Sequence, residues 1–182
     1  AASDVYKRQG DIASEILKEN IPISLYLLDL NEEMLLEGRK RLKKEKNIKY
    51  FIGNAEKLNF ENNFFDKYTI SFCLRNVTEY LLSIKEAYRV LKPGGKYCCL
   101  EFSTPKSSLI SSSYKIYKSK ILPLLGEIVA KDKNAYKYLS ESIDLFPSQE
   151  ELSKNLRDCG FTKVETINLF NGIVAIHTGY KL

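Results

Sequence analysis

Three polar residues end apolar segments of this sequence, where a buried strand would normally carry hydrophobic side chains. Asp29 closes the run that begins at Ile23, and Arg75 and Asn76 follow "SFCL" as a pair. A carboxylate can accept hydrogen bonds from both hydroxyls of a ribose, although Asp29 could equally cap a following helix. An arginine stays protonated, so Arg75 is a poor base but can fix an anion or orient a water or phenolate oxygen. The alternative for Arg75 is a structural ion pair or a helix-entry turn.

Four further residues occupy comparable places. Gly10 lies 19 residues before Asp29, close to the roughly 20-residue spacing between a glycine turn and a ribose-binding acid. Asn54 and Ala55 follow "YFIG" and suit recognition of an adenine edge, or form a plain turn. Ser71 lies near the end of another apolar run, and its hydroxyl could face a ligand or bond the backbone.

These residues can act together only if the elements before them form one sheet. Apolar bursts predict strands and amphipathic patterns predict helices, with Asn31, Thr78 and Ser148 as helix caps. The expected strands cover 23–29, 48–52, 67–73 and 96–102, and the expected helices cover 31–44, 78–91 and 148–159. Two final runs, 162–170 and 172–181, are separated by Asn171-Gly172, which is a strong hairpin signal.

This alternation predicts an α/β, Rossmann-like open sheet that is mainly parallel and ends in a C-terminal antiparallel hairpin. Such sheets bind ligands at the carboxyl ends of their strands, which is where the polar residues lie. The segment 107–146 is rich in Ser, Lys and Tyr, has helical spacing, and carries no strand pattern.

Composition narrows the class of protein. The 182 residues carry a net charge of +5, with lysines scattered along the chain, so a nucleic-acid partner is not expected. No apolar run is long enough to span a bilayer, and the four cysteines lack a metal-ligand spacing, which indicates a cytoplasmic protein without a metal. The single histidine, His177, lies in a strand pattern and is interpreted as structural.

Three longer stretches are more specific. They are "FIGNAEKLNFENNFFD", "ISFCLRNVTEYLLSIKEAYRVLKPGGKYCCLEFSTP" and the segment from "YKYLSESIDLFP" to "HTGYKL". Together they resemble the ubiquinone/menaquinone biosynthesis C-methyltransferase family, whose members use S-adenosylmethionine. The resemblance runs from about Gly10 to Leu182, whereas "LKPGG" alone would indicate only a class I methyltransferase.

The resemblance implies a role for each candidate residue. It implies that Gly10, Asp29, Asn54, Ala55 and Ser71 bind the cofactor, and that the catalytic pair Arg75 and Asn76 organises proton removal from a quinol. It further implies that 10–182 form the methyltransferase domain, that 107–146 form a helical cover over the acceptor, and that the substrate is a polyprenylated benzoquinol or naphthoquinol. A basic surface would suit anionic lipid, which adds the expectation of peripheral contact with the inner face of a membrane or with a quinone-biosynthesis complex.

The N-terminal segment departs from the family pattern. Residues 1–9 are polar and lack the apolar run of a central strand, so we expect them to lie outside the family domain and its first strand to be missing. A gap should then lie in the sheet, and cofactor binding should weaken. Two alternatives stay open: a class I methyltransferase with another small acceptor, and a non-catalytic partner in a membrane-associated quinone-biosynthesis complex.

Overall fold

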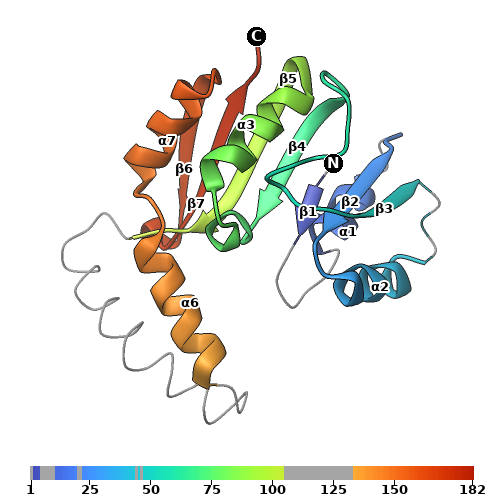
Figure 1. The fold of residues 1–182 in the computed structure, drawn as a ribbon, viewed down its shortest axis with the longest axis horizontal. Coiled ribbons are helices and arrows are strands. Elements are labelled where there is room, and N and C mark those ends of the chain that lie inside the picture. The colour runs from blue at the N-terminus through green and yellow to red at the C-terminus, as the bar shows by residue number, and fades with distance from the viewer. Residues whose placement is uncertain (1, 5–10, 20–21, 44, 46, 105–132) are drawn as a thin grey trace.

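The chain folds around one mixed β-sheet. The computed structural model describes residues 2–4, 11–19, 22–43, 45, 47–104 and 133–182. Within them, the strands lie in the order β3-β2-β1-β4-β5-β7-β6 (Figure 1). The strands are β1 Ala2–Asp4, β2 Leu25–Asp29, β3 Ile48–Ile52, β4 Phe65–Ser71, β5 Leu91–Phe102, β6 Thr162–Leu169 and β7 Val174–Tyr180. The pairs among β1 to β5 are parallel, whereas β7 is antiparallel to both β5 and β6, as the sequence predicts.

The predicted gap at the centre of the sheet is wrong. β1 pairs in parallel with β2, at Ala2 and Leu27, and with β4 along all three of its residues. The prediction failed because it required a continuous apolar run, whereas strand pairing is made by backbone groups, which small and polar residues also carry. The sheet is therefore continuous, although β1 is shorter than every other strand described.

Helices cover both faces of this sheet. Neighbouring strand residues point to opposite sides, so apolar side chains on both faces are buried against helices. They are α1 Asp11–Lys18, α2 Glu32–Arg41, α3 Tyr80–Val90, α6 Lys133–Leu145 and α7 Gln149–Asp158. Leu28 belongs to the main core cluster, which includes residues of α3 and α7, whereas its neighbour Leu27 joins a second cluster with Ala13 of α1. Figure 1 shows α3 and α7 on the same face of the sheet.

Two of the three predicted helix caps are confirmed. The side chain of Asn31 accepts hydrogen bonds from the backbone N–H groups of the first turn of α2, and Ser148 accepts one from Glu151 at the start of α7. The predicted cap at Thr78 is wrong, because α3 begins at Tyr80 with Glu79 in the N-cap position. The Glu79 N–H donates instead to the carboxylate of Glu56, a residue 23 positions earlier.

The C-terminal hairpin and α6 complete the fold. Asn171 and Gly172 lie in the 3-10 turn η4, Phe170–Gly172, with φ of 56° and 88°, and the strands on either side pair as a hairpin. Helix α6 leads into the start of α7 and extends past the carboxyl ends of the strands (Figure 1). It forms the described part of the predicted cover, 107–146, of which residues up to 132 lie outside the described chain.

Candidate functional site

A pocket of about 170 Å³ lies at the carboxyl ends of β2 and β3, beside the turn that follows β4. This is the edge at which open α/β sheets bind their ligands. The pocket has two walls, one from the ends of β2 and β3 and one from the turn after β4. Its lining residues are Leu28, Asp29, Leu30, Gly53, Asn54, Ala55, Glu56, Cys73, Asn76, Val77 and Thr78. Four of the seven residues that the sequence predicts for the site are among them: Asp29, Asn54, Ala55 and Asn76.

Asp29 ends β2 in the first wall and is only 4% exposed. Its Oδ1 accepts a hydrogen bond from the Asn31 N–H at 2.8 Å, while Asn31, and not Asp29, caps α2. Burial raises the pKa of Asp29 above its ordinary value, against the lowering effect of the Asn31 and Leu30 N–H groups. A largely buried carboxylate in a pocket wall is a strong acceptor for hydroxyl donors of a ligand.

The loop after β3 supplies the rest of the first wall. The Asn54 side chain accepts a hydrogen bond from the Glu56 N–H and donates one to Glu56 Oε2, both at 2.9 Å. Backbone and side-chain donors, first the Glu79 N–H and then Asn54, hold the pKa of Glu56 below its ordinary value. The turn interpretation of Asn54 is therefore confirmed, and an adenine contact by Asn54 and Ala55 stays a prediction.

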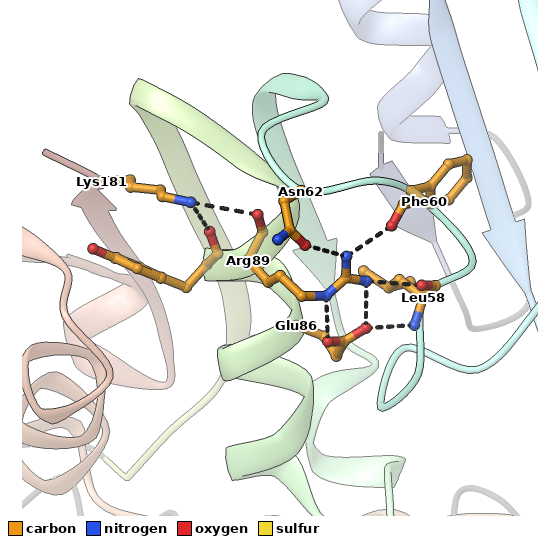
Figure 2. A network of polar contacts seen from close by, with 7 residues as sticks. Leu58, Phe60, Asn62, Glu86, Arg89 and Lys181 are labelled. Carbon is orange, nitrogen blue, oxygen red and sulfur yellow. Dashed lines mark hydrogen bonds and ion pairs between the residues drawn. The ribbon is translucent and has the colours of Figure 1, made fainter.

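Arg89 of α3 holds this loop against α3 through hydrogen bonds to its backbone (Figure 2). Its Nη1 donates to the Phe60 carbonyl at 2.7 Å and its Nη2 to the Leu58 carbonyl at 2.8 Å. Its Nε and Nη2 also donate to the two carboxylate oxygens of Glu86, one of which accepts the Leu58 N–H. Lys181 donates to the Arg89 carbonyl at 3.4 Å, which ties the C-terminal end to the same helix.

Aromatic packing holds the loop from its other side. Phe60 lies edge-on to Phe51 of β3 and to Phe65 of β4, with ring centroids 5.1 and 4.9 Å apart. Tyr26 of β2 stacks on Phe51 at 5.6 Å. Such pairs add to the stability given by burial alone. The first wall is thus a loop anchored at several points.

The second wall contains the pair Arg75 and Asn76 in the 3-10 turn η1, Leu74–Asn76. The Arg75 side chain is 1% exposed and its Nη1 lies 2.6 Å from Oε1 of Glu101, whose side chain is 2% exposed. The ion-pair interpretation of Arg75 is therefore confirmed. A contact between its guanidinium and an acceptor stays a prediction, because Arg75 is not among the pocket-lining residues.

Asn76 does line the pocket, and it also contacts the cover. Its Nδ2 donates to the Phe72 carbonyl at 3.4 Å, and its Oδ1 accepts a hydrogen bond from the Tyr138 hydroxyl of α6 at 3.3 Å. The Asn76 amide therefore lies between the pocket and the described part of the predicted acceptor cover.

Comparison with known proteins identifies the family of the chain. A model of the ubiE/COQ5 methyltransferase family matches residues 2–181. The chain belongs to this family. Its match includes most of residues 1–9, the segment that the sequence analysis separates from the family domain.

Two relatives and one solved structure illustrate the similarity. The chain is 47% identical to the ubiquinone/menaquinone biosynthesis C-methyltransferase UbiE of Rickettsia bellii, over 98% of this chain and 75% of the relative. It is 49% identical to the mitochondrial 2-methoxy-6-polyprenyl-1,4-benzoquinol methylase of Gallus gallus, over 85% of this chain and 50% of that protein. A SAM-dependent methyltransferase from Aquifex aeolicus shares the fold, with a TM-score of 0.67 at 17% identity over 100% of this chain and 81% of its own.

Two other predicted cofactor residues are not in the pocket lining: Ser71 lies outside it, and Gly10 is not among the residues that the structure describes. Ser71 ends β4 and is 1% exposed, and its buried Oγ has no hydrogen-bond partner among the described residues. An unbonded buried hydroxyl is costly, so Ser71 remains a candidate for a ligand contact.

Sequence reasoning missed two acidic residues, one in the pocket lining and one beside it. Glu101 ends "KYCCLE" as Asp29 ends "SLYLLD", so the same signal, a carboxylate at the end of an apolar strand, was present in both. Glu56 follows directly after the Asn54 and Ala55 pair and lines the pocket. A charged residue at the end of an apolar strand thus marks a candidate site residue, even when its interaction partner comes from a distant part of the chain.

The described residues contain no group of three or more His, Cys, Asp or Glu side chains arranged to hold a metal ion. The helices in the described part of the chain are all too short or too polar to span a lipid bilayer.

Proposed function

We propose that this protein is an S-adenosylmethionine-dependent C-methyltransferase that methylates the ring of a polyprenylated benzoquinol or naphthoquinol. The observation that carries the proposal is the pocket itself, in which Asp29, Asn54, Ala55 and Asn76 come together at the carboxyl ends of the strands. Family membership and the names of the two relatives support the reaction and the acceptor class.

The residues of the first wall fit the cofactor. The Asp29 carboxylate would bind the ribose hydroxyls, since it is a buried acceptor at the end of β2. The loop at Asn54 and Ala55 would contact the adenine. The Ser71 hydroxyl, which has no hydrogen-bond partner among the described residues, would gain one. When bound, the cofactor supplies a methyl group on a sulfonium sulfur, which is left as a neutral thioether.

The second wall would orient the acceptor. A new carbon–carbon bond forms at the ring carbon, which gives up its proton to solvent, and an ionised ring hydroxyl raises the electron density at that carbon. Asn76 and Tyr138 bring an amide and a hydroxyl together between the pocket and α6, where they can hold a ring oxygen in position. We place the protein in the cytoplasm, in peripheral contact with the membrane that contains its acceptor.

The test is methylation of demethylated quinols with short prenyl chains, using cofactor that carries ¹³C in its methyl group. The proposal predicts a product whose labelled carbon has the NMR shift of a methyl group on an aromatic carbon. A label on oxygen or nitrogen would contradict C-methylation. Turnover of phenols without a prenyl chain, at the same kcat/KM, would contradict the acceptor class and favour a class I methyltransferase with another small acceptor.

A further inference from the structure

The end of β5 and the turn after β4 are joined by a buried cluster around Glu101. Glu101 Oε1 accepts hydrogen bonds from Arg75 Nη1 at 2.6 Å and from the Phe102 N–H at 2.9 Å. Its Oε2 accepts the backbone N–H of Arg75 at 3.3 Å. The Arg75 guanidinium also lies 5.2 Å from the centre of the Phe102 ring. One carboxylate thus binds both the side chain and the backbone of the turn residue.

The same cluster reaches Asn76 through the Phe72 carbonyl. That oxygen accepts hydrogen bonds from Arg75 Nη1 at 2.8 Å and from Asn76 Nδ2 at 3.4 Å. Phe72 has a φ of 50°, in the left-handed region that non-glycine residues rarely adopt. Its ring packs on Phe102 at 4.8 Å, and its N–H donates to the Leu100 carbonyl. An unfavourable backbone conformation persists only where its surroundings hold it, and here the holding contacts come from β5.

The charges in this cluster indicate what Arg75 can do. Its guanidinium is buried and lies against a carboxylate, so the field that it presents to the pocket is largely that of a neutral pair. Removing either partner would leave a buried charge without its counter-ion. Burial raises the pKa of Glu101 despite the lowering effect of Arg75, so desolvation is the larger influence on this carboxyl.

We propose that Glu101 is a positioning residue for methyl transfer, because it holds the Arg75 turn and thereby fixes Asn76 in the pocket wall. Arg75 acts through the same contacts, on the Phe72 carbonyl and the turn, and not on the acceptor oxygen itself. The inference rests on the proposed function for the reaction, but its geometric part concerns only the position of Asn76.

The first experiment compares Glu101→Gln with the wild-type protein. Glutamine keeps the size and removes the charge, so the turn should move and kcat should fall about 100-fold, as displacements near 1 Å can cause. The dissociation constant of S-adenosylhomocysteine, measured by calorimetry, should change by less than about 3-fold, since Asp29 and the loop after β3 are untouched. The side-chain amide NMR signals of Asn76 should shift.

The chain offers a matched control at the other end of the same two strands. Asp66 of β4 and Lys92 of β5 form an ion pair with a separation of 2.9 Å, largely exposed to solvent. Asp66→Asn makes the same chemical change as Glu101→Gln outside the pocket, so it should leave kcat and the Asn76 signals at their wild-type values. A shift of the Asn76 signals in both variants would overturn the proposal.

A double-mutant cycle separates positioning from direct action by Arg75. Arg75→Met and Glu101→Leu each remove the contact between the two side chains, and the double variant removes it once. Positioning through this shared contact predicts that the losses are not additive, so kcat of the double variant should fall no further than that of the worse single variant. Losses of kcat that multiply in the double variant would overturn the proposal and assign Arg75 a direct role on the acceptor, independent of Glu101. If Glu101→Leu does not fold, Glu101→Gln takes its place in the cycle.

Failure of the proposed function would look different. A wild-type protein that binds S-adenosylhomocysteine but methylates no quinol would contradict the acceptor class. The Asn76 signals in Glu101→Gln and Asp66→Asn would still test the positioning role, because they depend on neither the acceptor nor turnover. Unchanged Asn76 signals in Glu101→Gln would overturn it in either case.

Discussion

The two walls of the pocket are each held by an arginine and a glutamate, but the two pairs differ in their exposure to solvent and in the effect that dominates the glutamate pKa. Arg89 and Glu86 lie one helical turn apart on α3, with side chains 32% and 20% exposed. Arg75 and Glu101 come from different elements and are almost completely buried. Arg89 lowers the pKa of Glu86, whereas burial raises the pKa of Glu101 even beside Arg75. Attraction therefore dominates in the first pair and desolvation in the second.

This difference predicts how each wall fails. The Arg89 network distributes its hydrogen bonds over several loop carbonyls, so the loss of one contact should loosen the loop gradually. The Arg75 pair concentrates two charges on side chains that are almost completely buried, so the loss of one partner should be severe.

The largest effect is expected for Arg75→Met. An uncompensated Glu101 should lower the free energy of unfolding by about 3–5 kcal/mol at pH 8. The folded-state pKa of Glu101 is already raised and should rise further, so the folded protein binds a proton that the unfolded chain releases. The loss should therefore be smaller at pH 5 than at pH 8, measured by urea unfolding. A loss below about 1 kcal/mol at both pH values would contradict the importance of desolvation.

Asp29→Asn should produce the next largest effect, on binding and not on folding. The affinity for S-adenosylhomocysteine should fall about 30-fold, because hydrogen bonds from hydroxyls to a carboxylate are lost. The free protein should be as stable as wild type or more so, since burial disfavours the Asp29 charge and the amide oxygen of the variant can still accept the Asn31 N–H. Calorimetry and thermal unfolding measure the two effects, with Asp66→Asn as the control.

The pH dependence of this binding has a definite sign. The ionised Asp29 accepts the ligand hydroxyls, so wild-type affinity should decrease as acidification protonates it, above the pH at which an ordinary aspartate would respond. The Asp29→Asn variant should lack this dependence. Identical pH profiles for both proteins would show that another group controls binding.

Arg89→Met should have a smaller effect on stability, about 1–2 kcal/mol, because the Leu58 and Phe60 carbonyls can turn to water. The pKa of Glu86 is lowered in the folded protein, so the pair contributes stability above the unfolded pKa and loses it as the pH falls through the folded one. The difference from wild type should therefore be greatest near pH 7 and shrink towards pH 3. This trend is the reverse of that expected for Arg75→Met, and a shared trend would erase the distinction between the walls.

The smallest effect is expected for Glu56→Gln. This substitution keeps the shape of the loop but weakens the hydrogen bond from the Glu79 N–H to the residue 56 side chain, which joins the loop to the start of α3. The neutral amide is a poorer acceptor for the Glu79 N–H at the start of α3, and the site is exposed, so the loss should be about 0.5 kcal/mol. Hydrogen exchange of the first α3 amides should increase relative to wild type. Unchanged exchange there would show that Glu56 does not cap the helix in solution.

Local signals made much of the fold and of the first wall predictable. The strand at Ile48–Ile52 and the α2 cap at Asn31 depend on residues a few positions apart, and both were predicted correctly. Asp29, Asn54, Ala55 and Asn76 lie in one pocket because parallel strands bring their carboxyl ends to one edge.

The errors share one physical cause, which is distance along the chain. Thr78 has the chemistry of a cap, but Glu79 occupies the N-cap position, and its N–H donates to Glu56, 23 residues earlier. The partner of Arg75 is 26 residues later, so its burial in an ion pair could be offered only as an alternative. The central strand was missed because its pairing depends on the backbones of β2 and β4 and not on an apolar run of its own.

The brevity of β1 also bears on how the molecule comes apart. Among the described residues, a single register pair joins β1 to β2, so the described pairing is sparse at the centre of the sheet. Partial opening should therefore separate β2 and β3, which carry Asp29, from the more extensively paired strands β4, β5, β7 and β6. A ligand that contacts both groups of strands would stabilise their association, and its release would accompany their separation.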